Sequence, residues 1–128
     1  MGIELDWNSP QRSYIVATVS KGWQVEDVVA ALANRHRMIN EVPHTPGLLI
    51  QIDSSFGIPP PRLLSRLRRI KLDGMALDQM MVVCAPPHQI AFLENLLFLA
   101  MPRLLETLKF TSDPQEAVNW LQQAGHSA

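Results

Sequence analysis

The chain has 128 residues, of which 47% are hydrophobic and 18% charged, and its net charge is −1. This length suits one domain with its own core, so we expect a single domain over residues 1–128. The near-balance of charge argues against a nucleic-acid partner, which usually needs a strongly basic surface. A single cysteine excludes an intrachain disulfide and a cysteine-cluster zinc site.

Nothing in the sequence predicts export or membrane insertion. The first ten residues, MGIELDWNSP, lack the apolar core of a signal peptide. The longest apolar run, Ile90 to Met101, is interrupted by Glu94 and Asn95 and is too short to cross a bilayer. We therefore expect a cytoplasmic protein without a transmembrane segment. We also expect no bound metal and no cofactor.

The first third of the chain predicts a β-hairpin followed by a helix. Apolar and polar residues alternate from Ile3 to Asn8, which is typical of a half-buried strand. Ser13 to Ser20 is rich in β-branched residues and predicts the second strand. Gln24 to Asn40 repeats apolar residues at helical spacing. The predicted buried stripe of this helix consists of Val25, Val28, Val29, Leu32, His36 and Ile39.

The middle of the chain, Leu48 to Ile70, reads as a strand, a polar turn and a helix. Leu48 to Asp53 is apolar with little alternation, which favours a central strand that is covered on both faces. Three prolines then lead into a helix, whose predicted buried face consists of Leu63, Leu64, Leu67 and Ile70. Ligands of open α/β sheets lie beyond the carboxyl ends of the strands, so this stretch indicates where a site would lie.

The last part of the chain predicts two further strands, each followed by a helix. The strands are expected at Gln79–Ala85 and Leu105–Thr111, the second being weaker. The helices are expected at Pro87–Met101 and from the start signal Ser112–Glu116 to about residue 124. The complete order predicts an α/β fold, a mixed five-stranded sheet with an antiparallel N-terminal hairpin, βα units and about four helices.

This order of elements, with these residues, resembles the STAS superfamily and within it the SpoIIAA-like group. The resemblance rests on the opening strand pair, the Gly22-Trp23 step, and the stretches LLIQIDSS, MMVVCA and FTSDPQEAVNWL. It covers nearly the whole chain. It implies a non-enzymatic regulatory or protein-interaction module. Because the SpoIIAA-like group is similar to lipid-binding Sec14-type domains, it also implies an apolar-ligand (lipid) binding domain as the alternative.

The resemblance also implies a regulatory serine. STAS domains of the sporulation type carry a phosphorylatable serine in an Asp-Ser-Ser-Gly turn after the third strand. Asp53, Ser54 and Ser55 resemble this turn, with Phe56 inserted before Gly57. The implied phospho-switch is therefore Ser54 or Ser55.

Polar side chains are also expected at the edge of the sheet where the third and fourth strands end. Asp53, Ser54 and Ser55 lie at the end of one strand, and Cys84 and His88 lie at or just after the end of the other. Because helix N-termini bind anions, this group predicts a phospho or anion site. A small hydrolase is a less favoured reading, since no nucleophile elbow or phosphate loop is present. The alternative is that these side chains cap turns and that Cys84 belongs to the core.

Three arginines are spaced to share one face of the predicted second helix. Arg62, Arg66 and Arg69 recur at i, i+4 and i+7, without acidic partners at helical spacing. Such a face can dock a phosphate, an acidic partner or an anionic membrane surface. A solvated helix face is the alternative interpretation.

The helix from Pro87 to Met101 is apolar on both sides. The residues expected to face the sheet are Ile90, Leu93, Leu96, Leu97 and Ala100. Phe92, Phe98 and Leu99 then lie on the outer side, where a surface helix is normally polar. An apolar face of this kind needs a second cover. We consider the neighbouring helix, a second copy of the chain in a homodimer, and a bound lipid or other small apolar ligand.

Overall fold

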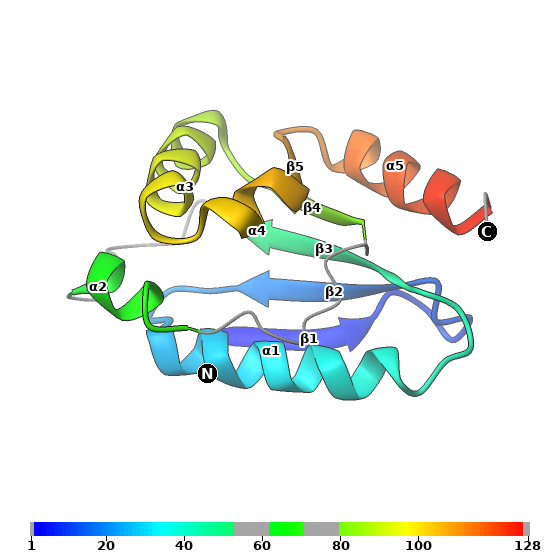
Figure 1. Cartoon of the computed structure of the whole chain (residues 1–128). Coiled ribbons are helices and arrows are strands. Elements are labelled where there is room, and N and C mark those ends of the chain that lie inside the picture. The colour runs from blue at the N-terminus through cyan, green and yellow to red at the C-terminus, as the bar shows by residue number, and fades with distance from the viewer. Residues whose placement is uncertain (1, 53–61, 71–79, 127–128) are drawn as a thin grey trace.

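The computed structural model describes residues 2–52, 62–70 and 80–126, which form an α/β fold (Figure 1). The strands are β1 (Ile3–Trp7), β2 (Tyr14–Val19), β3 (Gly47–Ile52), β4 (Met81–Cys84) and β5 (Leu108–Thr111). The helices are α1 (Val25–Ile39), α2 (Leu63–Leu67), α3 (Pro87–Ala100), α4 (Pro102–Thr107) and α5 (Pro114–His126). The predicted fold class is confirmed.

The five strands form one mixed sheet in the order β1-β2-β3-β4-β5. β1 pairs antiparallel with β2, and the remaining neighbours are parallel. Each parallel connection moves one strand in the same direction, so right-handed crossovers put their helices on the same face. Accordingly, side chains of α1, α2, α3 and α4 share one core with the sheet, whereas α5 packs on the opposite face.

Each face of the sheet has its own core because alternate residues of a strand point to opposite faces. On the α5 face the buried residues are Tyr14, Leu49, Val82, Ala117 and Leu121. On the other face, Ile15 and Met81 are among the buried residues. Strands β3 and β4 are therefore apolar on both faces, as the sequence predicts for central strands.

Helix α1 lies within the predicted range, but its buried face differs from the predicted stripe. Arg35 and Met38 are buried, whereas Val29 is 52% exposed and His36 is exposed. The aliphatic part of an arginine side chain packs well against apolar neighbours, so a charged residue can lie on the inner face of a helix. The prediction that placed Val29 and His36 in the buried stripe is wrong.

The first three residues of the expected strand Leu105–Thr111 belong to a helix. Residues Pro102–Thr107 form α4, and β5 begins only at Leu108. Proline at the first helical position has the φ that a helix needs, and it lacks only an N–H that a helix would leave unpaired there. Leu105 N donates to the carbonyl oxygen of Met101 at 3.1 Å, which closes the first turn.

The two long amphipathic helices begin with side-chain caps. In α1, Gln24 N donates to Asp27 Oδ2 at 2.8 Å. In α5, Gln115 N donates to Asp113 Oδ1 at 3.0 Å. These bonds satisfy backbone donors that have no partner inside a helix. The predicted start of the last helix is confirmed.

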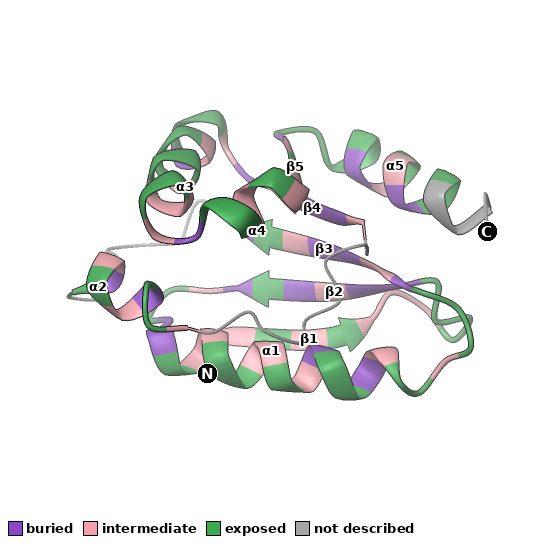
Figure 2. Ribbon diagram, in the orientation of Figure 1, coloured by how far each residue is buried: buried purple, intermediate pink, exposed green. Residues whose placement is uncertain are grey.

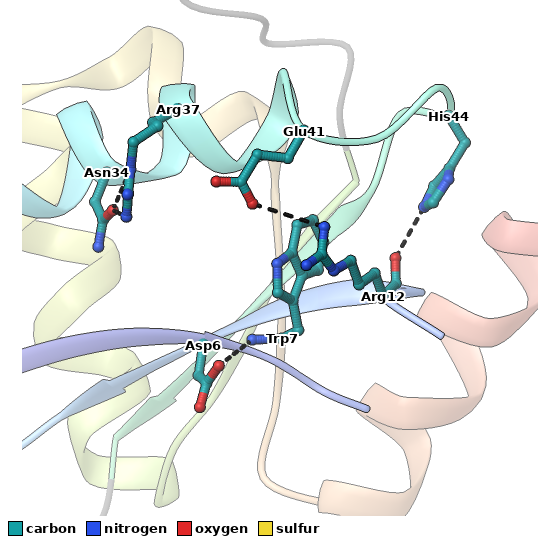
Figure 3. A network of polar contacts seen from close by, with 7 residues as sticks. All are labelled: Asp6, Trp7, Arg12, Asn34, Arg37, Glu41 and His44. Carbon is teal, nitrogen blue, oxygen red and sulfur yellow. Dashed lines mark hydrogen bonds and ion pairs between the residues drawn. The ribbon is translucent and has the colours of Figure 1, made fainter. Parts of the chain in front are cut away.

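A polar network ties the β1–β2 turn to the end of α1 (Figure 3). Arg12 lies over the ring of Trp7 at 5.7 Å, and its Nη1 is 3.9 Å from Glu41 Oε2. His44 Nε2 lies 2.9 Å from the carbonyl oxygen of Arg12. The network is at the amino ends of the parallel strands. It is therefore remote from the edge where the sequence predicts a site.

We expect Gly2→Ala to destabilise the protein. A Cβ at this position would lie 2.2 Å from Trp23 Cα, a backbone atom that cannot move alone. Overpacking of this kind costs roughly 1–3 kcal/mol. Urea unfolding measures the loss, with Glu4→Ala on the exposed side of β1 as the control. Equal stability of Gly2→Ala and the wild type would contradict the close approach.

Candidate functional site

The carboxyl ends of β2, β3, β4 and β5 meet at one edge of the sheet, and the prediction that β3 and β4 end there together is confirmed. An open depression at this edge is lined by Thr18, Gln51, Ile52, Cys84, Ala85, Pro86, Pro87, Ser112 and Pro114. His88 is exposed in the first turn of α3. Asp53, Ser54 and Ser55 lie outside the described residues, so the phospho or anion site stays a prediction.

The polar groups near the end of β5 bond to one another. Thr111 Oγ1 donates to Glu116 Oε1 at 2.7 Å and accepts from Asp113 N at 3.0 Å. Together with the Asp113 cap, these bonds hold the start of α5 against the end of β5. Their role is therefore to position a helix.

Cys84 ends β4 and is half-buried. Burial raises the pKa of its thiol, and the negative charge of Asp113 raises that pKa further. The thiolate is the nucleophilic form of cysteine, and it is disfavoured here. The surroundings of Cys84 thus do not activate it.

The arginine-rich segment forms a shorter helix than predicted. α2 ends at Leu67, and Ile70 N then donates to the carbonyl oxygen of Leu67, an i→i−3 turn. Arg66 forms an ion pair with Glu26 of α1. Sequence spacing could not show this acidic partner because it comes from another helix. Arg62 and Arg69 are exposed, and their docking role stays a prediction.

The outer side of α3 is exposed (Figure 2). Phe92, Phe98 and Leu99 are 38%, 67% and 53% exposed. The residues of α3 that pack against the helix-side core are Ile90, Leu93, Leu96, Leu97 and Ala100, the same five that the sequence predicts to face the sheet. Arg68 Nε donates to the carbonyl oxygen of Leu99 at 3.2 Å, which joins α2 to the end of α3.

An apolar cavity of about 190 Å³ lies between the sheet and the helices on its α1–α4 face. Its strand residues are Ile3, Leu5, Ala17, Val19, Leu48, Ile50, Ile52, Met81, Val83, Leu108 and Phe110. The rest of its described lining comes from the four helices and two flanking residues: Val28, Ala31, Leu32 and Arg35 of α1, Leu67 of α2, Leu93, Leu96 and Leu97 of α3, Leu104 of α4, and Trp23 and Met101.

Among the described elements, the short α2 covers only part of the sheet next to the cavity. With five residues, α2 is about 8 Å long, whereas the six residues of β3 span about 20 Å. α2 packs mainly against α1 and α3. Ile50, in the middle of β3, therefore stays only partly buried although it faces the helix layer. The sequence signal for this gap is weak, since Leu63, Leu64 and Leu67 read as part of a longer helix.

Comparisons with other proteins do not identify the chain. No family model matches the sequence, and no curated protein or solved structure matches it. The STAS resemblance therefore stays a prediction. Within the described ranges, none of the helices combines the length and hydrophobicity that a membrane span requires.

The raised pKa of Cys84 predicts slow alkylation. Its rate of reaction with iodoacetamide should rise only above the ordinary pKa of cysteine, because the thiolate forms later. Asp113→Asn removes one of the two causes and keeps an oxygen for the helix cap, so the midpoint should move to lower pH. Labelling rates followed by mass spectrometry from pH 6 to 11 test this (roughly the range in which thiols titrate). A wild-type midpoint below the ordinary value would reveal an activated cysteine.

Proposed function

We propose that this chain is a non-enzymatic protein-interaction or regulatory module that self-associates through the outer face of α3. One observation carries the proposal. The described residues include four large apolar side chains that are exposed, and three of them, Phe92, Phe98 and Leu99, lie on α3. Burying one such side chain is worth about 1.5–3 kcal/mol, so this face gains substantially from a cover.

A second copy of the chain suits this face. Asn95 is exposed and lies between Phe92 and Phe98 on the same helix. An amide both donates and accepts, so across a two-fold axis Asn95 can pair with itself. A polar residue in the middle of an apolar helical interface is a known means of fixing register. The pattern supports a symmetric dimer in which the α3 helices pack against each other.

The arginine segment offers a second surface for regulation. Arg62 and Arg69 are exposed, and α2 is joined to α3 through Arg68 and Leu99. An acidic or phosphorylated partner that binds these arginines would therefore lie next to the outer face of α3. A cytoplasmic location, which we also propose, suits the reduced state of the single cysteine.

Apolar-ligand binding is the second candidate function, and the cavity on the α1–α4 face favours it. The two candidates use opposite sides of α3. They are therefore compatible and can be tested separately.

The double variant Phe92→Asp/Phe98→Asp should be a monomer where the wild type is a dimer. In a symmetric dimer each phenylalanine is buried in both copies, so the double substitution removes four apolar side chains from the interface. Association should weaken roughly a hundredfold or more. Light scattering over a range of concentrations measures the mass. Val29→Asp is the matched control because Val29 is also exposed but lies on α1, and this variant should stay dimeric. A monomeric wild type at all concentrations would refute self-association.

The phospho-switch predicts phosphate on Ser54 or Ser55 in protein isolated from its own cell. A phosphoserine there adds negative charge a few positions before the exposed Arg62, and the two can form a charge-assisted pair. Mass spectrometry of the peptide spanning residues 48–62 tests this directly, with Ser54→Ala/Ser55→Ala as the control. An unmodified peptide under all growth conditions would remove the switch and leave the α3 interface unaffected.

A further inference from the structure

We propose that the cavity between the sheet and helices α1, α2, α3 and α4 binds a neutral apolar molecule of about eight carbon atoms. The site lies inside the helix-side core. It is independent of the proposed self-association, because Phe92, Phe98 and Leu99 are not among the residues that line it.

The volume of the cavity sets the size of its ligand. A well-studied apolar cavity of about 150 Å³ stays dry and binds benzene, which corresponds to about 25 Å³ for each carbon atom. On this scale, the cavity of about 190 Å³ holds seven or eight carbon atoms. A sixteen-carbon fatty acid would need about 400 Å³, so the cavity cannot enclose the whole molecule. The volume therefore favours a single small molecule over a membrane lipid.

The lining determines the chemical class of the ligand. In the part of the chain that the structure describes, Arg35 is the only charged residue that lines the cavity. Arg35 is buried and already has an interaction partner within the protein. A charged ligand group would have to compete with that partner and leave water at the same time. A neutral molecule without polar groups meets neither cost.

The ligand can enter between α1 and α3. Leu32 of α1, Leu97 of α3 and Ile50 of β3 line the cavity and are partly exposed. The partial exposure of these three residues indicates that the cavity is open to the surface in the described part of the chain.

Ethylbenzene, with eight carbon atoms, is the probe. It should raise the melting temperature in a saturable manner, because a molecule that binds only the folded state stabilises that state. In NMR spectra it should shift the methyl signals of Ile50 and Leu97 and show nuclear Overhauser contacts with them. Absence of a saturable response in both measurements would overturn the proposal.

Two alanines of α1 provide a matched pair of variants. Ala31 lines the cavity, whereas Ala33 is exposed. Ala31→Leu adds three carbon atoms, or about 75 Å³, and should weaken ethylbenzene binding roughly tenfold or more. Ala33→Leu and Phe92→Asp/Phe98→Asp should bind as the wild type does. Unchanged binding by Ala31→Leu would place the probe elsewhere and overturn the proposal. If Ala31→Leu does not fold, the Overhauser contacts in the wild type decide the question.

Hexadecanoate and phosphatidylcholine vesicles test the size limit. Neither should displace ethylbenzene or shift the Ile50 and Leu97 methyl signals. Displacement by either would show that the site accommodates a long acyl chain and would overturn the assignment to a small molecule.

Discussion

The structure depends on covering a sheet whose central strands are apolar on both faces. On one face α5 provides the cover in the described part of the chain, and it packs closely, since Ala117 and Leu121 are almost fully buried. At Gly47, a Cβ would lie 2.6 Å from Leu121 Cδ2, so the absence of a side chain in β3 permits this approach. On the other face the cover is shared by four helices, because every crossover between parallel strands returns on that side.

Among the described residues that shared cover leaves a cavity, and empty apolar volume has an energetic cost. Empty volume in a closed apolar core costs about 24 cal/mol for each Å³, which sets an upper bound of about 4–5 kcal/mol for about 190 Å³, and the cost is lower here because the cavity is open to the surface. The net stability of a domain is only about 5–15 kcal/mol. An empty cavity of this size therefore lowers the free energy of unfolding. A bound molecule recovers part of the lost contact, which gives the cavity a physical reason to be occupied.

The sequence predicts most elements because their signals are local. Alternation, apolar runs and caps such as Asp113 are sufficient for the hairpin, β3, β4 and the start of α5. The predictions are wrong where contacts with distant parts of the chain determine which residues are buried and where a helix ends. The burial of Arg35 in place of His36 depends on the angle at which α1 packs on the sheet. The ion pair of Arg66 with Glu26 and the extent of α2 are likewise tertiary properties. The cavity lies between elements whose extent and packing depend on such tertiary contacts, so no local sequence pattern indicates it.

Helix α3 connects the two proposed sites. Leu93 and Leu97 line the cavity from one side of the helix, and Phe98 lies exposed on the other. The exposed side of the helix carries the large apolar side chains of Phe92, Phe98 and Leu99, so the position of the helix depends on what packs against each of its faces. A molecule that fills the cavity holds the inner face, and a second copy holds the outer face. Because Phe92, Phe98 and Leu99 do not line the cavity, a substitution on the outer face leaves the cavity lining unchanged, and the two proposed sites can be separated by experiment.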